Sequence, residues 1–564
     1  MTARGGGPLL ELAGLRVAFG DTEVVRGVSL ELAAGECVAI VGESGSGKSV
    51  TARSLLGMAG NGARVTADRL RIAGRELGAA PEREWRRVRG REVGLVLQDA
   101  LVALDPLRPV GREIGDALRI HERMPRAARR TRVHELLAEV GMPDPARAAR
   151  QRSGELSGGL RQRALIASAL ALDPPLLIAD EPTTALDATV QARVLELLGE
   201  IRGRGTGVLL ISHDLAVVSR LADRVLVMRE GVVVEQGPTA EVLGSPREPY
   251  TRALIAAVPA DVPRGARLSA SPASPDASDS AGVALAPPST HDAVHSPTSD
   301  PAPLLAIDDV VKTFPSPGGG RFTAVDGVSL EVRAGETVGL VGESGSGKTT
   351  LARLALALTA PDRGVVNFEG EPWSALPERE RRERRPRLGA IYQDALSSFD
   401  PRWSVARILA DAVDGAAAVG RGAEHPSRAT TARRVAELLD QVGLPGTVGG
   451  RDPLTLSGGQ RQRVAIARAL AASPEVLVCD EPVSALDVTI QAQILDLLDA
   501  LQRERGLAML FISHDLGVVR HMADRVAVMQ DGRIVEQGPA EAVFAAPGHP
   551  YTARLVADAP RLVH

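Results

Sequence analysis

Cysteine, aromatic residues and long apolar runs are all scarce in this 564-residue chain. It has only two cysteines, Cys37 and Cys479, which excludes a disulfide framework or a cysteine-based zinc site and fits a reducing compartment. Aromatic residues make up 2% of the chain, so its cores must be aliphatic. Its longest apolar runs, such as residues 164–172, fall short of the roughly 18 residues that span a bilayer, and the opening residues lack the apolar core of a signal peptide.

Lysine is the scarcest charged residue, because 63 of the 66 basic side chains are arginines. Two of the three lysines, Lys48 and Lys348, occupy the same position in the strings GESGSGKS (42–49) and GESGSGKT (342–349). Both strings follow the G-x-x-x-x-G-K-[ST] pattern of a loop that cradles phosphates. A requirement for a compact point charge at these two positions explains why arginine is not used there.

The overall charge gives no reason to expect nucleic acid as a partner. The formal net charge is −4, and charged residues make up 24% of the chain, an ordinary share for a globular protein. Glutamates interleave the arginine runs at 82–91 and 378–387, so these runs are typical of solvated, salt-bridged helix faces.

The two halves of the chain repeat each other motif by motif. LSGGL at Leu156 matches LSGGQ at Leu456, and Asp180-Glu181 matches Asp480-Glu481, both with the 300-residue offset of the lysines. We therefore expect domains at 1–258 and 304–564. The Pro/Ser/Ala-rich stretch 259–303 between them has no periodicity, and we expect a disordered tether there with a typical span of about 35 Å.

Each half has the pattern of an α/β fold with a mainly parallel sheet. Short aliphatic runs, such as CVAIV at 37–41 and LLIAD at 176–180, alternate with helical stretches. Between Gln98 and Leu156 the sequence is helical and rich in arginine, and the equivalent stretch is about 395–455. We expect a helical subdomain inserted into each half.

The loops and the strand ends carry the expected chemistry. Backbone N–H groups and the lysine of each loop face phosphates, while Ser49 and Thr349 are suited to hold Mg²⁺. Asp180 and Asp480 end aliphatic strands and can organise Mg²⁺; Glu181 and Glu481 can polarise an attacking water. Taken alone, an Asp-Glu pair at a strand end is as often a cap of the next helix as a catalytic pair. Here each pair follows a phosphate loop along the chain, which favours the catalytic role.

In order along the chain, these motifs resemble those of the ABC ATPases. The first half has its loop, Gln98, LSGGL, LLIADE, ALD at 185–187 and ISHD around His213; the second has its loop, Gln393, LSGGQ, VLVCDE, ALD at 485–487 and ISHD around His514. The resemblance covers roughly residues 9–258 and 304–560. It implies two tandem ABC-type P-loop NTPase domains that bind ATP and Mg²⁺.

The resemblance also implies that the halves pair head to tail, so that each ATP is held by one half's loop and the other half's signature. The first composite site would combine Gly42, Ser44, Gly45, Ser46, Gly47, Lys48, Ser49, Gln98, Asp180, Glu181 and His213 with Ser457, Gly458, Gly459 and Gln460. The second would combine Gly342, Ser344, Gly345, Ser346, Gly347, Lys348, Thr349, Gln393, Asp480, Glu481 and His514 with Ser157, Gly158 and Gly159. Leu160 replaces the usual signature glutamine there.

The resemblance assigns further roles to individual residues. The metal ligands would be Ser49, Gln98 and Asp180 in one site and Thr349, Gln393 and Asp480 in the other. Glu181 and Glu481 would be general bases, and His213 and His514 would contact the γ-phosphate. Adenine would stack on Phe19 in the first half and on Phe314 or Phe322 in the second.

Finer features resemble the peptide and nickel importers of the ABC family. These are QDALVALDP and QDALSSFDP after the glutamines, and the tails EPYTRAL (248–254) and HPYTARL (549–555). The similarity implies two integral membrane permease subunits and an extracytoplasmic solute-binding protein as partners. It also implies peripheral attachment to the cytoplasmic face of the inner membrane. Residues 249–268 contain no cysteine, so we expect no iron–sulfur cluster in the first tail.

Two alternatives stay open at this point. A ribosome-acting ATPase of the ABC-F type also joins two ATPase halves, although its inter-domain segment is charged and helical, whereas residues 260–303 here are rich in Pro and Ser. The cargo of an importer is chosen by its other subunits. Di- or oligopeptides lead, and nickel or glutathione are the alternatives.

Overall fold

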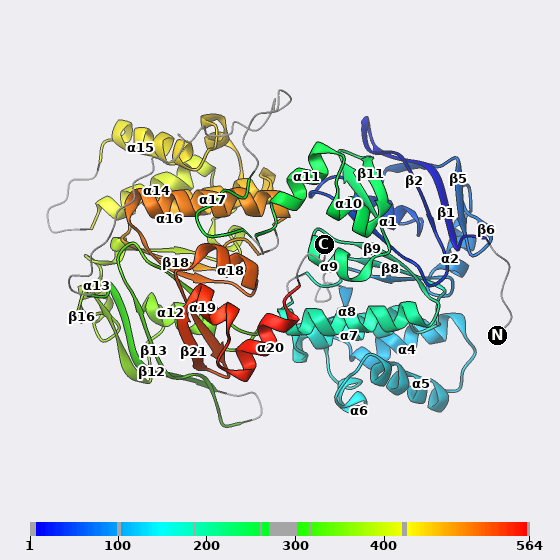
Figure 1. Cartoon of the computed structure of the whole chain (residues 1–564), viewed down its shortest axis with the longest axis horizontal. Coiled ribbons are helices and arrows are strands. Elements are labelled where there is room, and N and C mark those ends of the chain that lie inside the picture. Colours follow the sequence, from blue (N-terminus) through cyan, green and yellow to red (C-terminus); the bar gives the residue numbers. More distant parts are fainter. Residues whose placement is uncertain are drawn as a thin grey trace. The chain divides into compact units, whose positions relative to one another are not determined.

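The computed structural model describes residues 7–98, 103–184, 186–259, 262–269, 302–315, 319–419, 426–484 and 486–560. Residues 99–102 of QDALVALDP and the alanines Ala185 and Ala485 of the ALD motifs lie outside these ranges, as does most of the segment 259–303. The chain divides into two compact units, one running to Ile255 and the other from Ala256 to Ala559. Each unit is described by itself (Figure 1).

The first unit contains two sheets. The antiparallel sheet has the order β2-β1-β5-β6, with β4 also paired to β1, and the other sheet has the order β11-β10-β3-β9-β8-β7. All neighbours in the second sheet are parallel except β10 and β11. The strands are β1 (Leu10–Phe19), β2 (Thr22–Leu32), β3 (Cys37–Val41), β4 (Ala63–Thr66), β5 (Arg69–Ile72), β6 (Arg75–Glu76), β7 (Val93–Val96), β8 (Leu176–Asp180), β9 (Gly207–Ile211), β10 (Arg224–Arg229) and β11 (Val232–Pro238).

The helices of the first unit include the expected insert between Gln98 and Leu156. They are α1 (Lys48–Ser54), α2 (Glu82–Val88), α4 (Val110–His121), α5 (Arg126–Glu139), α6 (Pro145–Ala148), α7 (Gly158–Ala169), α8 (Ala188–Gly203), α9 (Leu215–Leu221), α10 (Thr239–Gly244) and α11 (Pro249–Ala256). In Figure 1, α4 and α5 lie together, apart from the strands β1, β2 and β5 of the same unit. The helical insert is thus a separate subdomain of the unit.

The second unit repeats this plan. Its mainly parallel sheet has the order β17-β18-β19-β14-β20-β21, and its antiparallel sheet the order β13-β12-β15-β16. The strands are β12 (Leu305–Pro315), β13 (Arg321–Val332), β14 (Thr337–Val341), β15 (Arg363–Phe368), β16 (Glu371–Pro372), β17 (Leu388–Ile391), β18 (Val476–Asp480), β19 (Ala508–Ile512), β20 (Arg525–Gln530) and β21 (Arg533–Pro539). The expected α/β class with two mainly parallel core sheets is confirmed.

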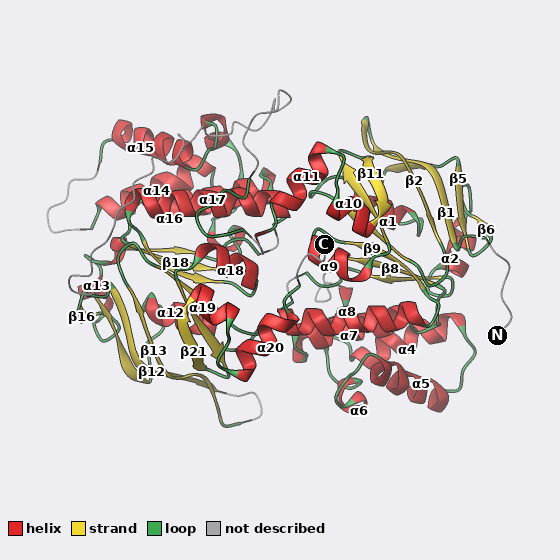
Figure 2. Cartoon of the chain, viewed as in Figure 1, coloured by secondary structure: helices red, strands yellow, loops and turns green. Residues whose placement is uncertain are grey.

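The helices of the second unit include α14 and α15, which lie apart from the antiparallel strands β12 and β13 in Figure 2. They are α12 (Lys348–Ala355), α13 (Glu378–Arg381), α14 (Val405–Ala417), α15 (Arg428–Gln441), α16 (Gly458–Leu470), α17 (Val488–Arg505), α18 (Leu516–Met522), α19 (Ala540–Ala545) and α20 (Pro550–Asp558). The helical insert expected at about 395–455 is therefore present as α14 and α15.

The cores are aliphatic, as the scarcity of aromatic residues predicts. In the first unit β3 and β9 are buried along their whole length, as are β14 and β19 in the second. Both cysteines are free and buried, and burial raises the pKa of the Cys37 thiol to about 12. Both thiols therefore lie in environments that suit a role in core packing.

Residues 262–269, which the sequence assigns to the tether, pack on the second unit. The backbone N–H groups of Leu268 and Ser269 donate to the Asp496 carboxylate of α17, at 3.0 and 2.9 Å. The Leu268 side chain is buried in the core of that unit. The carbonyl oxygen of Val262 lies 3.2 Å from Nδ1 of His521 in α18, and Arg264 forms an ion pair with Asp524. The second unit therefore begins well before the expected boundary at 304.

Candidate ATP site

The parallel strand order brings the candidate residues of each half to one edge of the sheet. In the first unit β3, β9, β8 and β7 are neighbours, and the phosphate loop, His213, Glu181 and Gln98 each follow the carboxyl end of one of them. This edge is where ligands bind in open parallel sheets. The second half places its loop, His514, Glu481 and Gln393 after the corresponding strands.

Glycine is required at two positions of each phosphate loop. Gly42 has φ +147°, and a Cβ atom there would lie 2.1 Å from the carbonyl oxygen of Met228. Gly47 has φ +97°, and its Cβ would lie 2.9 Å from the carbonyl oxygen of Val24. Gly342 and Gly347 meet the same restrictions in the second half. At these two positions the loop lies against the backbone of neighbouring strands, which leaves no room for a side chain there.

Both loop lysines are buried and turn back over their own loops. Nζ of Lys48 donates to the carbonyl oxygens of Gly42 and Glu43, each at 2.7 Å. Nζ of Lys348 makes the same two bonds, at 2.7 and 2.8 Å. The side chains of Lys48 and Lys348 are thus enclosed, with 5% and 7% of each residue exposed. Each ammonium group is held at the loop that would receive phosphate.

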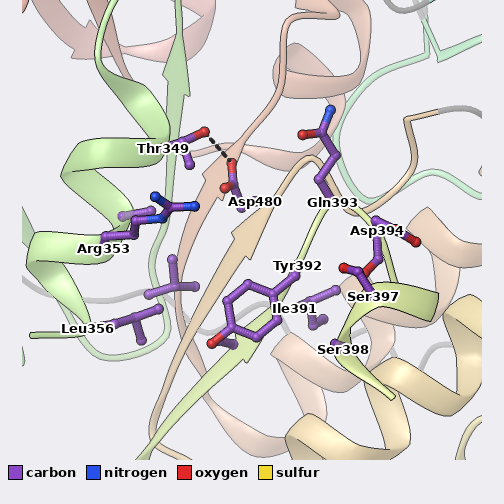
Figure 3. A pocket seen from close by; sticks show the side chains of 13 residues that line it. Thr349, Arg353, Leu356, Ile391, Tyr392, Gln393, Asp394, Ser397, Ser398 and Asp480 are labelled. Carbon is purple, nitrogen blue, oxygen red and sulfur yellow. Dashed lines mark hydrogen bonds between the residues drawn. The ribbon is translucent and has the colours of Figure 1, made fainter. Parts of the chain in front are cut away.

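A hydroxyl and a carboxylate lie together beside each lysine. Oγ of Ser49 donates to Oδ1 of Asp180 at 2.9 Å, and Oγ1 of Thr349 donates to Oδ1 of Asp480 at 3.4 Å (Figure 3). Burial is the main cause that raises the pKa of both aspartates. Oδ2 of Asp180 is buried and has no hydrogen-bond partner among the described residues. Hard oxygen donors with an unsatisfied carboxylate oxygen fit Mg²⁺, which would also favour the ionised aspartate.

Glu181 lies between a glutamine and a histidine. Nε2 of Gln98 donates to Oε2 of Glu181 at 2.7 Å, and Nδ1 of His213 lies 3.3 Å from Oε1. Gln393, Glu481 and His514 form the same arrangement, with the same two distances. The glutamine amide thus contacts the expected general base in this structure, whereas its role as a metal ligand stays a prediction.

The backbone at both glutamates is in the left-handed region. Glu181 has φ +48° and Glu481 has φ +51°, which few residues other than glycine adopt. Such a conformation costs on the order of 1 kcal/mol and is concentrated at functional sites. It turns each side chain out of the strand direction, toward the histidine of the neighbouring strand.

Charge coupling sets the protonation of each glutamate and histidine. Burial is the largest single effect on Glu181 and acts to raise its pKa, but His213, Thr184 and Lys48 together outweigh it, and the pKa is lowered. Burial is also the largest single effect on His213 and acts to lower its pKa, but Glu181 and Asp214 together outweigh it, and the pKa is raised. The second half shows the same directions for Glu481 and His514. The pair therefore favours an ionised glutamate beside a charged histidine.

We expect the Glu181→Gln variant to lower the pKa of His213, because burial then acts on the imidazole without its carboxylate. In the wild type, the stabilisation from His213 is complete below the unfolded pKa of about 6.5 and is lost as pH rises through the higher folded pKa. The stabilisation from Glu181 is complete above about pH 4.3 and is lost as pH falls through its lower folded pKa. The pair thus stabilises the fold most between about pH 4.3 and 6.5.

Imidazole NMR titration of the variant checks this expectation. His514 in the same molecule is the internal control, because its partner Glu481 is unchanged. An unchanged pKa of His213 in Glu181→Gln would contradict the coupling.

Each signature serine lies at the start of the helix that follows the insert, α7 in the first half and α16 in the second. Oγ of Ser157 caps α7 by accepting from the N–H of Leu160 at 3.4 Å, and Oγ of Ser457 caps α16 by accepting from Gln460 at 3.2 Å. Oε1 of Gln460 also accepts from the N–H of Ser457, which completes a capping box. Leu160 has no side-chain oxygen for this second bond, so the departure from the signature weakens the start of α7.

The second signature glycine is needed for packing. A Cβ atom at Gly159 would lie 2.3 Å from Cγ1 of Val190 in α8, and one at Gly459 would lie 2.5 Å from Cγ2 of Ile490 in α17. The glycines therefore let the signature helix approach the helix after the Asp-Glu pair. Asp187 and Asp487, which precede these second helices, cap them through bonds to Val190 and Ile490.

The candidates for adenine stacking differ in exposure. Phe19 packs partly buried against the core of the first unit. Phe314 and Phe322 are opposite each other on β12 and β13 and are 39% and 56% exposed. Both are open to a ligand, so the choice between them stays a prediction.

Sequence reasoning missed one pair of residues at the site. The hydroxyl of Tyr250 accepts from the N–H of Glu43 in the first loop at 3.1 Å, and that of Tyr551 accepts from the N–H of Glu343 in the second at 2.9 Å. Both tyrosines belong to the repeated tails EPYTRAL and HPYTARL. That repetition is the signal that could have pointed to them.

Comparison with known proteins identifies the family. Residues 25–184 and 325–484 match the ABC transporter family, and residues 234–281 and 535–564 match the oligopeptide/dipeptide transporter C-terminal region. Among the described residues, no helix is both long and apolar enough to cross a membrane.

Three curated relatives match nearly the whole chain. The peptidoglycan transport ATP-binding protein YejF of Agrobacterium fabrum is 42% identical over 98% of this chain and 96% of its own. The oligopeptide transport ATP-binding protein OppD of Mycobacterium tuberculosis is 42% identical, with 98% of each chain covered. The glutathione import ATP-binding protein GsiA of Salmonella choleraesuis is 40% identical over 98% of this chain and 89% of its own. With both ATP-binding halves and both tails matched, this chain belongs to the ABC transporter family as an ATP-binding protein.

Proposed function

We propose that this chain hydrolyses ATP to energise an importer of di- or oligopeptides. The observation that carries the proposal is the duplication of a complete site. Each half holds a buried lysine at its loop, a hydroxyl–carboxylate pair, and a glutamate between a glutamine and a histidine. The full-length similarity to transport and import ATP-binding proteins favours this role over a ribosome-acting one.

We infer that ATP binds at two composite sites, each completed by the signature of the other half. Lys48 would act with Ser457, Gly458, Gly459 and Gln460, and Lys348 with Ser157, Gly158 and Gly159. In support, Ser157 caps α7 and Ser457 caps α16, so the N–H groups at these helix starts are suited to face phosphate. Each half would then contribute residues to both sites.

Magnesium would be held by Ser49 and Asp180 in one site and by Thr349 and Asp480 in the other. Gln98 and Gln393, the other expected ligands, now bond to the glutamates and would have to give up those hydrogen bonds to reach the metal. When bound, Mg²⁺ neutralises charge on the phosphates. The lowered pKa of Glu181 and Glu481 keeps each carboxylate ionised and able to accept a proton from the attacking water. The adjacent histidines hold the glutamates in place and would contact the γ-phosphate.

Integral membrane permeases are the partners that such an ATPase requires, and they would attach it to the inner face of the membrane. A cavity of about 390 Å³ in the second half lies beside the proposed magnesium ligands Thr349 and Asp480, which line it together with Gln393, Tyr392 and Ser397 (Figure 3). We propose that a permease segment approaches the site at this cavity. Since Gln393 also donates to Glu481, a permease segment seated there would bias the position of the general base.

Occlusion of ATP tests the composite sites. In a background of Glu181→Gln and Glu481→Gln, which slows hydrolysis, we expect two ATP molecules to be retained per chain after gel filtration. Adding Lys48→Ala with Ser457→Ala damages one composite site only and should leave about one; adding Lys48→Ala with Ser157→Ala damages both and should leave none. Equal retention by the two combinations would contradict the assignment.

The cargo is tested with the membrane partners present. Reconstituted with its permeases, the chain should hydrolyse ATP faster when the solute-binding protein carries a di- or oligopeptide. Stimulation by glutathione or nickel instead would assign the alternative cargo. Sedimentation of the chain with ribosomes would overturn the transport proposal.

A further inference from the structure

The tail that follows the last strand of each half is fastened to that strand by a glutamate. In the first half the Glu235 carboxylate accepts from the N–H groups of Arg247 and Glu248, at 2.8 and 3.2 Å. In the second half the Glu536 carboxylate accepts from Gly548 and His549, at 2.7 and 3.0 Å. These bonds satisfy backbone donors at the start of α11 and α20 and thereby set the position of each tail helix.

One side chain of each tail helix reaches the phosphate loop of its own half. The two tyrosines concerned, Tyr250 and Tyr551, are two of only three tyrosines in the chain. Their hydroxyls accept from the N–H groups of Glu43 and Glu343. Tyr551 is 3% exposed, so its hydroxyl lies away from bulk water. Because the same hydrogen bond is present in both halves although their sequences differ, we infer that the fold depends on it.

The contact acts on the same residue that holds the loop lysine. Glu43 donates its N–H to Tyr250 and accepts from Nζ of Lys48 through its carbonyl oxygen, at 2.7 Å. Glu343 is placed in the same way between Tyr551 and Lys348. A shift of this residue would therefore move the carbonyl that holds the lysine and the N–H groups beside it.

We propose that Tyr250 and Tyr551 are positioning residues that hold the phosphate loops ready for ATP and couple the tails to nucleotide binding. The inference rests on the proposed ATP sites. It is distinct from a purely structural role, in which the hydroxyl would only fasten the tail to the core. By linkage, a tail that favours ATP binding must itself be stabilised when ATP binds.

The test is ATP binding to variants in which only the hydroxyl is removed. In the background of Glu181→Gln and Glu481→Gln, Tyr250→Phe should raise the Kd of the site containing Lys48 by about three- to tenfold, the loss of one hydrogen bond. Tyr551→Phe should do the same at the site containing Lys348. The unchanged half is the matched control, since calorimetric titration should show one weakened and one normal site.

A second measurement separates positioning from simple attachment. On addition of ATP, hydrogen exchange should slow at the amides of 250–256 in the background protein and less so in Tyr250→Phe. Glu235→Gln, which weakens the fastening of the same helix, should raise the same Kd. Combined with Tyr250→Phe it should add little, because both changes act through one contact.

The outcomes are distinguishable. A lower melting temperature with unchanged Kd values in Tyr250→Phe would overturn the inference and leave the ATP sites intact. No ATP binding by the background protein itself would refute the proposed function instead. If Tyr551→Phe does not fold because its ring is buried, Tyr250→Phe decides alone, since Tyr250 is only partly buried.

Discussion

Replacing both Glu181 and Glu481 with glutamine is expected to slow ATP hydrolysis by about 10²- to 10⁴-fold, the usual loss on removing a general base. Glutamine retains the shape of the side chain but cannot accept the proton of the attacking water. ATP binding should persist, because the loops and both lysines are unchanged. Phosphate release and equilibrium binding of ATP measure the two effects separately.

A matched control is available at the surface of both halves. Glu84 and Glu380 occupy equivalent positions and pair with arginines in exposed ion pairs. Replacing them with glutamine removes the same two charges and should leave hydrolysis unchanged, because such pairs contribute little. Undiminished hydrolysis in the Glu181→Gln, Glu481→Gln protein would refute the assignment of the general bases.

Replacing Lys48 and Lys348 with arginine is expected to weaken ATP binding by about 10- to 100-fold, although the charge is kept. Each lysine side chain is enclosed, and its Nζ fits between two carbonyl oxygens of the loop. The larger, planar guanidinium cannot take that place without displacing the backbone. Equilibrium dialysis with ATP and Mg²⁺ measures the effect.

Lys312→Arg is the control for this substitution. Lys312 is the third lysine of the chain and lies outside both loops, and its Nζ donates to the carbonyl oxygen of Ala360 at 2.7 Å and to Asp362 at 2.9 Å. Arginine can keep this ion pair, so the ATP affinity of the site containing Lys48 should not change. The control is limited to that site, because Nζ of Lys312 also lies 5.8 Å from the centre of the Phe314 ring, a candidate for adenine stacking in the second half. If Lys48→Arg, Lys348→Arg and Lys312→Arg all bound ATP equally well, the loops would not require lysine, and the proposed reason for its presence there would be wrong.

Much of the site could be predicted from sequence, because its residues follow the ends of buried aliphatic runs. Once β3, β8 and β9 are parallel neighbours, their carboxyl ends must meet, and Lys48, Glu181 and His213 come together with them. The helical inserts could be predicted for the same reason, since their periodicity differs from that of the strands.

The remaining features depend on tertiary contacts that no local pattern contains. The left-handed backbone of Glu181 is imposed by the surrounding structure, since glutamate has no preference for it. The bond from Glu43 to Tyr250 joins residues 207 positions apart. Composition alone predicts disorder for residues 262–269, yet Leu268 is buried because α17 offers it a place in a core.

The packing of residues 262–269 adds to the hydrophobic core of the second unit. Leu268 is 2% exposed in that core, and the Asp496 carboxylate accepts from the N–H groups of Leu268 and Ser269. Full burial of a leucine side chain contributes about 1.5–3 kcal/mol. Removing residues 262–269 should therefore lower the melting temperature of the second unit, which a segment without packing contacts would not do.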